Sequence, residues 1–315
     1  MPETLRKLGL YFRDLDTYWK APDENQALAV EPGPTGRYLV DIVPRLEQGH
    51  YDRFDEQGLP IRPSRDGKGF FHNYTTLCSY ALANWEKYLI TGDRQYADLL
   101  IKVARFFLTS GQRLDDGSLM LRESSDRPLS AMNQGEGMSV LVRAWQYSDE
   151  QPFLDAARGC SLPFTRNVDD DGVVEPMVGT GLPWYEELGA RPVDHILNGM
   201  IYALWGLRDL ALASDDRQAK ELLEQGIESL DRALPQFDRG YWSDYSIMED
   251  GTSIIASIMY HNLHVVQLTR MAKETGLQTL SEHAGRFKKY AGSTPNRLRA
   301  GLMLARRKVA KRLRR

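Results

Sequence analysis

Apolar residues recur at every third or fourth position through most of the chain after residue 70. This is the spacing of amphipathic helices. Short polar turns interrupt the pattern four times and divide it into four pairs of helices. The first helices of the pairs are predicted at Thr75–Ile90, Gln134–Tyr147, His195–Ala213 and Ile255–Lys273. The second helices are predicted at Tyr96–Leu108, Pro152–Cys160, Gln218–Leu234 and Leu280–Tyr290.

The turns within the pairs support a repeated unit. Gly92 and Gly276 suit helix C-caps, and Asp149 and Asp215 suit N-caps of the helices that follow. Successive turns lie about sixty residues apart, which is the length of one helical hairpin and a connecting loop. Four such hairpins predict a mainly α fold, an α/α toroid with inner and outer helices. An irregular helical bundle is the alternative.

The links between the hairpins share a second pattern. They read RLDDGSLML, VDDDGVVEPM and FDRGYWSDYSI. Each has Asp-Gly or Arg-Gly before an apolar and polar alternation, which predicts short β-hairpins. All three follow an outer helix, so we expect them at one mouth of the ring, where they would form a cleft. In the third link, alternation would place Tyr241, Ser243 and Tyr245 on one strand face, opposite Trp242 and Asp244.

Residues 1–70 lack the helical pattern and hold six prolines from Pro22 to Pro63. RYLVDIVP predicts a strand, and HYDRFDEQGLPI predicts a strand and a turn. We therefore divide the chain into an N-terminal irregular and β-containing arm (1–70), the α/α toroid (71–290) and a C-terminal tail (291–315).

Composition excludes several classes of protein. With 42% hydrophobic and 26% charged residues the chain is neither disordered, collagenous nor a disulfide scaffold. Its apolar runs are shorter than a membrane span requires, and MPETLRKLGLYFRDLD lacks the apolar core of a signal peptide. Cys78 and Cys160 then suit small buried hydrophobes in a reducing cytosol. We expect a cytoplasmic protein.

Charge is distributed unevenly. Residues 286–315 hold twelve of the forty Lys and Arg residues and no Asp or Glu, so residues 1–285 carry 28 basic and 43 acidic residues, a net charge of −15. An acidic body excludes nucleic acid as its partner.

The tail has an apolar stripe in a basic sequence. Leu298, Leu302, Ala305, Val309 and Leu313 recur at helical spacing among seven Lys and Arg residues that follow position 305. A basic amphipathic helix is typical of a membrane-surface anchor or a binder of acidic polymer. We expect peripheral attachment at the inner face of an anionic membrane. A solvated helix docked on the acidic body is the alternative.

Cofactor motifs are missing from the sequence. There is no Walker pattern and no GxGxxG after a strand, and Gly135 and Gly137 suit a helix start better than a phosphate site. His261 and His264 could share a metal, but they lack a third ligand nearby. No GxSxG supports a serine hydrolase. We therefore expect neither a cofactor nor a metal.

Aromatic and acidic residues gather near the predicted mouth. Trp184, Tyr185, Glu186 and Glu187 precede a helix, where exposed aromatic rings beside paired acids suit a sugar-binding cleft. The alternative is a helix N-terminus with two favourable carboxylates and two core aromatics. Tyr260 and His261 are polar among apolar residues, and a hydrogen-bonded core pair is the alternative for them.

These segments carry a family resemblance. From about Arg37 to Tyr290 the chain resembles the glucuronyl C5-epimerases, the heparan-modifying enzymes and their bacterial relatives. The matching pieces are FDEQGLPI, QGEGMSVLVRA, WYEE, ILNGMIYALWGLRDL, GIESLDRALPQFDRGYWSDY and YHNLHVVQL. The resemblance implies an α/α barrel of four hairpins. It also implies a reaction that inverts C5 of glucuronate within a polysaccharide, by removing the proton beside the carboxylate and returning one to the opposite face.

The resemblance also implies residue roles. The family's Glu of WYEEY falls on Glu187, its Tyr after a glycine turn on Tyr245 (or on Ser243 if the register shifts by two), and its Tyr of DYH on Tyr260. The family's Tyr after that Glu falls on Leu188, which is a departure. We expect Tyr245 and Tyr260 to be an opposed proton-transfer pair that Glu187 orients or activates, and Tyr185 to be a possible substitute at Leu188.

His261 or His264 would add positive charge near the substrate carboxylate. The expected substrate-binding residues are Trp184, Tyr185, Glu186, Asn198, Arg143, Tyr241, His261 and His264. Arg143 and Asn198 are equally candidates for structural contacts.

We therefore expect a uronyl C5-epimerase, an isomerase of polysaccharide biosynthesis that acts on an acidic glucuronate-containing polymer such as heparosan. One alternative is a polysaccharide lyase of the same ring architecture, because its first step is the same proton removal. A second is a non-catalytic glycan-binding relative. A homodimer is left open.

Overall fold

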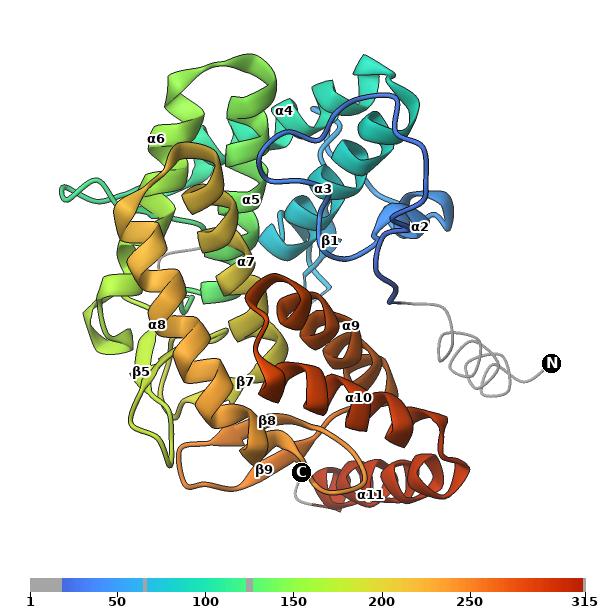
Figure 1. The fold of residues 1–315 in the computed structure, drawn as a ribbon. Helices are drawn as coiled ribbons and strands as arrows, with labels where there is room; N and C mark the ends of the chain where they lie inside the picture. Colours follow the sequence, from blue (N-terminus) through green and yellow to red (C-terminus); the bar gives the residue numbers. More distant parts are fainter. Residues whose placement is uncertain (1–18, 65–66, 123–126, 314–315) are drawn as a thin grey trace.

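A computed structural model describes residues 19–64, 67–122 and 127–313, with side chains as far as Arg307. Four antiparallel helical hairpins follow one another round an α/α toroid (Figure 1). The inner helices are α3 (Tyr74–Thr91), α5 (Ala131–Ser148), α7 (Leu197–Ser214) and α9 (Ile258–Thr275). The outer helices are α4 (Arg94–Ser110), α6 (Gln151–Ser161), α8 (Arg217–Ala233) and α10 (Gln278–Gly292).

The fold confirms the eight helices expected from the sequence. Bounds agree within a few residues, except that His195 and Ile255 belong to strands rather than to the starts of α7 and α9. The third hairpin shows the difference between an inner and an outer helix most clearly: α7 buries 14 of its 18 residues, whereas α8 buries 6 of 17. An inner helix is covered on most sides, whereas an outer helix buries one face.

Close approach of α5 and α7 depends on two glycines. A Cβ on Gly206 would lie 2.1 Å from the carbonyl oxygen of Gly135, and a Cβ on Gly135 would lie 2.6 Å from the carbonyl oxygen of Tyr202. Any side chain at either position would therefore push the two inner helices apart. The GxG of the sequence serves helix packing, not a phosphate site.

The helix caps are only partly as expected. Gly92 and Gly276 end α3 and α9 at φ 71°, which confirms their prediction as C-caps. Asp149 and Asp215 were expected to be N-caps, and this is wrong. They end α5 and α7 in the left-handed conformation, at φ 58° and 50°. Aspartate tolerates that region better than most residues because its short polar side chain bonds locally.

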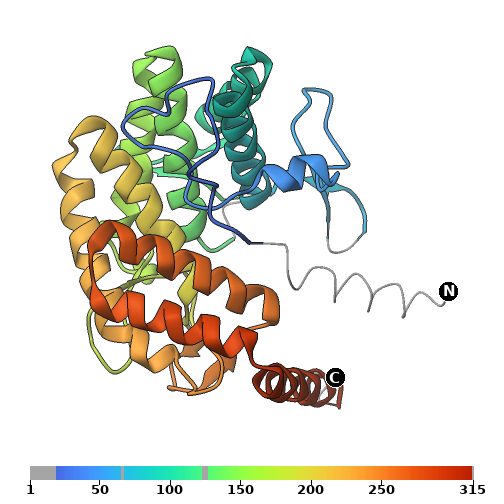
Figure 2. The ribbon, with the colours of Figure 1, turned by 45° about the vertical axis from the view of Figure 1, so that its right-hand side comes forward.

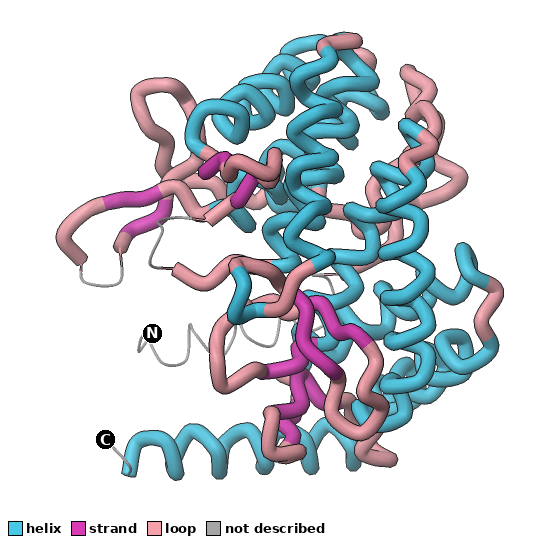
Figure 3. Tube along the Cα trace, turned by 90° about the vertical axis from the view of Figure 1, so that its left-hand side faces the viewer, coloured by secondary structure: helices cyan, strands magenta, loops and turns pink. Residues whose placement is uncertain are grey.

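Short strands occupy the connecting segments and form four small antiparallel sheets (Figure 3). They are β1 (Arg62–Pro63) with β2 (Phe70–Phe71), β3 (Gln112–Arg113) with β4 (Leu119–Met120), β5 (Val174–Pro176) with β6 (Pro183–Tyr185), and β7 (Asp194–Ile196) with β8 (Asp244–Met248) and β9 (Ser253–Ile255). The first link is the hairpin expected. In the second, a 3₁₀ turn at Val168–Asp170 comes first, and β5 pairs with the PWY segment instead.

The arm follows an irregular path. RYLVDIVP was expected to be a strand and is not: its first residues are bends, and Val43–Glu47 form the short helix α2, which has a proline in its first turn. Phe54 and Pro60 form a bridge round the expected turn. Tyr38, Leu39 and Val40 are buried in the core that the inner helices share, so the arm is packed on the toroid.

The arm also joins the two ends of the helical series. Glu24 pairs with Arg270 on α9 at 2.8 Å, and Arg37 pairs with Glu86 on α3 at 2.8 Å. In Figure 2 this segment crosses between the first and the last hairpin.

The tail forms the helix α11 (Thr294–Leu313), which was expected from its periodicity. Ala300 and Leu304 pack on the toroid, whereas Leu298 and Leu302 of the expected stripe are 65% and 63% exposed. Among the described helices, none combines the length and apolar character of a bilayer-crossing segment.

Candidate active site

Tyr245 and Tyr260 meet at the mouth formed by the N-terminal ends of the inner helices. Tyr260 lies in the first turn of α9, and Tyr245 lies in β8 where the register with β9 is irregular. Such a bulge re-aims a side chain. The two rings are 4.7 Å apart between centroids, and their hydroxyls interact with each other. The expected pairing is present, but rings this close cannot face each other across a sugar.

Glu187 lies beside these tyrosines. A Cβ on Gly199 would be 2.6 Å from its carboxylate, so the absence of a side chain there lets Glu187 approach the first turn of α7. Asn198 Nδ2 donates to Glu187 Oε2 at 3.3 Å. Burial, reinforced by the charge of Asp194, raises the pKa of Glu187 to about 7. Glu187 in turn raises the pKa of Tyr245 and Tyr260, beyond the larger effect of their burial.

Two further charged residues belong to this site and were missed. Glu136, on α5, is 5% exposed, and its Oε2 has no hydrogen-bond partner among the described residues. Burial raises its pKa to about 8, with Glu187 adding to the shift and Arg45 opposing it. Arg45, on α2, also lowers the pKa of Tyr260. A charged residue among the buried positions of QGEGMSV was the available signal for Glu136.

The first three residues of the PWYEE segment form the strand β6, and its two aromatic rings are not an exposed platform. Trp184 and Tyr185 in β6 are fully buried: Trp184 stacks on Phe237, and the Tyr185 hydroxyl donates to the Leu222 carbonyl at 2.6 Å. The expectation of exposed aromatics is wrong because both rings fill the space beneath α8. Tyr185 is therefore no substitute for a tyrosine at Leu188, which is 50% exposed.

Glu186 is also removed from solvent. It is fully buried and pairs with His195 of β7 at 2.5 Å. The chain bends at Glu187, just after β6, and the two neighbouring acids have different partners: His195 for Glu186 and Asn198 for Glu187. Glu187 is the acid that joins the tyrosines.

His261 and His264 do not supply positive charge. Burial lowers the pKa of His261 to about 4 and that of His264 well below its usual value. The Ser243 Oγ lies 2.7 Å and 2.9 Å from their Nδ1 atoms, and His261 Nε2 donates to the Phe287 carbonyl. Both imidazoles are therefore neutral core groups that hold β8 against α9, and Ser243 belongs with them. The hydrogen-bonded core alternative is correct for His261.

Arg143 and Tyr241 are engaged elsewhere. Arg143 is 1% exposed and pairs with Asp209 at 2.5 Å, so it joins α5 to α7 inside the core. Tyr241 lies beneath the guanidinium of Arg299 on α11, at 3.8 Å from the ring centroid. Both were expected to bind substrate, and their burial favours structural roles. Tyr241 was expected to share a strand face with Tyr245, but it lies outside the strand, because β8 begins only at Asp244.

The site therefore contains a pair of neighbouring phenols, two carboxyls with pKa values near neutrality and a half-buried guanidinium. Such groups can move protons at neutral pH and stabilise an anion. Within the described residues, no group of three His, Cys, Asp or Glu side chains is arranged to hold a metal ion.

The fold defines an α/α-toroid protein, and solved structures share it. Cellobiose 2-epimerase from Bacillus thermoamylovorans B4167 superposes with a TM-score of 0.57 and 10% identity, over 79% of this chain and 67% of that one. The cellobiose 2-epimerase of Spirochaeta thermophila DSM 6192 gives 0.52 and 14%, over 90% and 80%. At these identities the likeness concerns the fold alone.

Sequence comparison is more specific. Residues 121–289, more than half of the chain, match the family model of the D-glucuronyl C5-epimerase C-terminus, and the chain belongs to that family. A D-glucuronyl C5-epimerase of Caenorhabditis elegans is 33% identical over 177 residues, which are 51% of this chain and 28% of the relative. An uncharacterized protein of Methanocaldococcus jannaschii is 24% identical over 46% of this chain and 47% of its own. The chain thus spans less than half of either relative.

Proposed function

We propose that this protein is a carbohydrate epimerase, and specifically a uronyl C5-epimerase that acts on a glucuronate-containing polysaccharide. The observation that carries the proposal is the meeting of Tyr245, Tyr260 and Glu187 at one mouth of the toroid, in a chain that belongs to the D-glucuronyl C5-epimerase C-terminus family. The residues come from β8, α9 and the segment after β6, so only the folded chain brings them together.

In this proposal Glu187 is the base. A carboxylate with a pKa of about 7 is ionised in a large fraction of molecules at neutral pH and still holds a proton once it has received one. It takes the C5 proton and becomes a neutral acid, and the electron pair left at C5 spreads into the uronate carboxyl as an enediolate. Asn198 keeps the Glu187 carboxylate in place.

Tyr260 is the acid on the other face. It lies in the first turn of α9, and its ring is 4.7 Å from that of Tyr245 between centroids, so the two hydroxyls can share one proton-transfer site. When Tyr260 protonates C5, the neighbouring Tyr245 hydroxyl donates a hydrogen bond to the phenolate, which stabilises the new charge. Tyr245 therefore positions and supports Tyr260 rather than opposing it.

Arg45 is placed to neutralise the enediolate. It is half-buried, and its positive charge is felt by Tyr260 and Glu136. A guanidinium forms paired hydrogen bonds with a carboxylate, which suits the uronate group as its charge increases. Arg45 thus takes the role that the sequence assigned to His261 or His264.

Two rival functions remain distinguishable. A lyase would share the proton removal by Glu187 and then expel the oxygen at C4. A non-catalytic glycan-binding protein is favoured by one observation, the exposed Leu188 where the family has a tyrosine.

Incubation with unsulfated glucuronate polymer in heavy water tests the proposal. We expect deuterium at C5 and iduronate in the product, measured by NMR, without the ultraviolet absorbance of an unsaturated uronate. A rise in that absorbance would identify a lyase. Binding of the polymer without either signal would identify a glycan-binding protein.

We also propose that α11 attaches the protein to the anionic inner face of a membrane. Leu298 and Leu302 are exposed on the same helix as the exposed Arg306 and Arg307, and an apolar stripe flanked by basic residues suits an anionic interface. Each Lys or Arg near such a surface contributes about 1 kcal/mol of binding free energy.

A sedimentation assay tests the membrane proposal. The full chain is expected to sediment with anionic vesicles at low salt. A chain that ends at Leu304, and so keeps the packed Ala300 and Leu304, is expected to stay in the supernatant while keeping its activity on soluble polymer. Neutral vesicles are the control for charge, and Leu298→Ser with Leu302→Ser is the control for the apolar stripe. Equal sedimentation of the full and shortened chains would refute membrane attachment through α11.

A further inference from the structure

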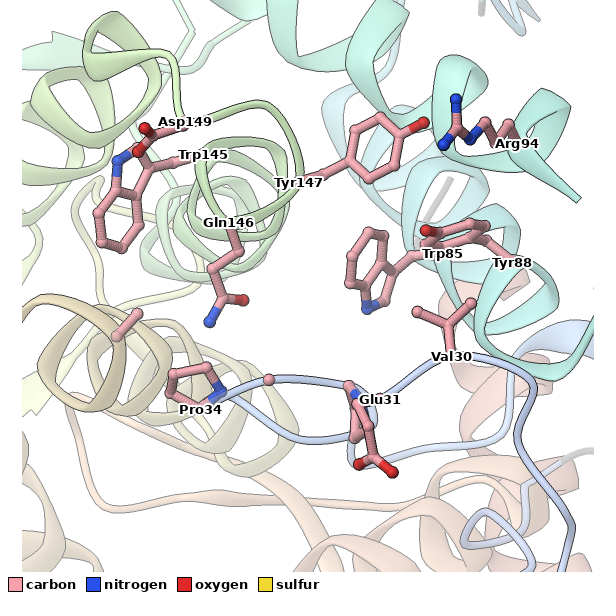
Figure 4. Close-up of a pocket in the computed structure, with 13 residues that line it drawn as sticks. Val30, Glu31, Pro34, Trp85, Tyr88, Arg94, Trp145, Gln146, Tyr147 and Asp149 are labelled. Carbon is pink, nitrogen blue, oxygen red and sulfur yellow. The ribbon is translucent and has the colours of Figure 1, made fainter. Parts of the chain in front are cut away.

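A pocket lies at the ends of the inner helices opposite to the candidate active site. It has a volume of about 750 Å³ and is bounded by the C-terminal turns of α3 and α5, by Ala213 of α7 and by the arm segment 30–34. Figure 4 shows Trp85 and the carboxamide of Gln146 above the arm segment that carries Pro34 and Glu31. Glu136 and Gln146 are ten residues apart on α5, so the two sites are separated by about 15 Å along the helix.

The lining is aromatic. Trp85, Tyr88 and Tyr147 form one cluster, with ring centroids 5.4 Å apart for Trp85 and Tyr88, and 5.4 Å apart for Tyr88 and Tyr147. Trp145 adds a fourth, half-buried ring. Aromatic rings offer large, flat apolar faces, and a pyranose has an apolar face of C–H groups of similar size.

Two hydrogen-bond donors in this lining have no partner among the described residues. They are Trp85 Nε1, in a side chain that is 4% exposed, and Gln146 Nε2. Buried donors in folded proteins are usually satisfied by protein, water or a ligand. Both nitrogens are covered from solvent in the structure, so the aromatic faces, rather than these two donors, would contact a sugar.

The arm wall of the pocket is fixed rather than loose. The Thr35 hydroxyl donates to Gln146 Oε1 at 3.0 Å, and the Thr35 carbonyl accepts from Arg208 at 3.1 Å. The amide of Val30 bonds to the Leu89 carbonyl at 3.1 Å. A pocket with walls held in this way is preformed, which lowers the entropic cost of binding a ligand.

Charge selects against an acidic ligand. Exposed Glu31 and Asp149 line the pocket with one exposed cation, Arg94. The C-terminal ends of α3 and α5 also direct their carbonyl groups toward this mouth, and that end of a helix disfavours anions. A uronate is therefore the wrong ligand, and an uncharged sugar is the right one.

We propose that this aromatic pocket is a binding site for a neutral pyranose, separate from the epimerase site. The proposal does not rest on the epimerase function, because binding here requires neither Glu187 nor the tyrosine pair.

Titration of the full chain with two neutral oligosaccharides, cellotetraose and N-acetylchitotetraose, tests the proposal. The readout is the indole N–H signal of Trp85 in ¹⁵N-correlated NMR spectra, with the affinity measured by calorimetry. We expect at least one of the two to shift the Trp85 signal, at a dissociation constant of about 1 mM or below. A glucuronate-containing tetrasaccharide is expected to leave that signal unchanged.

Variants identify the pocket. Ala213→Trp fills it from α7, and Trp145→Ala removes one ring, so each is expected to weaken neutral-sugar binding at least tenfold. Phe70→Ala removes an aromatic side chain that is 51% exposed outside the pocket, and should bind like the parent. Thermal unfolding of each variant establishes that it is folded.

Three results would overturn the proposal. They are an unshifted Trp85 signal with both neutral probes up to about 10 mM, undiminished binding in folded Ala213→Trp, and an equal response to the glucuronate tetrasaccharide. Loss of the epimerase signal in heavy water would leave the pocket proposal untouched, so failures of the two proposals are distinguishable.

Discussion

The two ends of the inner helices carry different chemistry. The N-terminal ends hold two acids, Glu136 and Glu187, beside the Tyr245–Tyr260 pair and the guanidinium of Arg45. At the C-terminal ends, aromatic rings and unpaired donors surround a pocket with a net acidic lining. Parallel orientation of the four inner helices polarises the toroid, because helix N-termini favour anions and C-termini disfavour them. This polarity is consistent with the two proposals, which assign a polyuronate to the N-terminal ends of the inner helices and a neutral sugar to their C-terminal ends.

The largest expected effect is a loss of epimerase activity from a substitution at the N-terminal ends of the inner helices. Tyr260→Phe removes the proposed acid and is expected to lower kcat by about 10²–10⁴-fold, since that is the typical contribution of general acid catalysis. Tyr245→Phe removes only the neighbouring hydroxyl that supports Tyr260 and should cost less. The measurement is the rate of deuterium entry at C5, with the Phe70→Ala variant as control.

Neutral-sugar binding at the second mouth should be the same in both Phe variants as in the parent. If the parent is active and both Phe variants turn over at its rate, the site assignment is wrong.

The next effect concerns stability and pH. Glu136 has a folded-state pKa of about 8, raised from 4.5 by burial. The folded state therefore holds this proton more tightly than the unfolded state. Its contribution to the free energy of unfolding is fully present below pH 4.5 and is lost as the pH rises through 8. Between these two values the loss is on the order of 1.4 kcal/mol per pH unit.

Glu136→Gln removes this titration. Urea unfolding at pH 5 and pH 8.5 is expected to show that the variant gains free energy of unfolding relative to the parent as the pH rises. Glu31→Gln at the second mouth is the matched control and should show no such gain. An identical pH dependence in parent and Glu136→Gln would contradict the buried, proton-holding role of Glu136.

The smallest expected effect comes from Leu188→Tyr. Leu188 is half exposed beside Glu187, so a tyrosine there fits without repacking the core and restores the family's residue. We expect a rate increase below about tenfold, because the acid and base of the proposed mechanism are already present. Leu188→Phe is the control that adds the ring without the hydroxyl, and an equal rate increase in both would assign the effect to packing.

The local sequence was enough to predict the eight hairpin helices and many of the residues at which they end. The three-to-four spacing of apolar residues determines which face of a helix can be buried, so all eight hairpin helices were predicted from positions such as Leu77 and Trp85. Gly92 and Gly276 were predicted as C-caps because a left-handed residue is a local requirement. Asp149 was misassigned because aspartate suits both an N-cap and a left-handed C-cap, and the choice depends on where the neighbouring helix begins.

Within the site, sequence similarity led to Tyr245, Tyr260 and Glu187, and the folded structure places the three together. It could not predict that Trp184, Tyr185, Arg143 and both histidines are buried, because burial depends on which elements cover a residue. Arg45 and Glu136 lie about ninety residues apart, and only the packing of α2 against α3 and of α3 against α5 brings their charges together.

Short-range periodicity thus determined the helices of this protein. The pKa values of Glu136 and Glu187, and the pocket at the other mouth, arise from desolvation and contacts between distant segments, which only the tertiary structure decides.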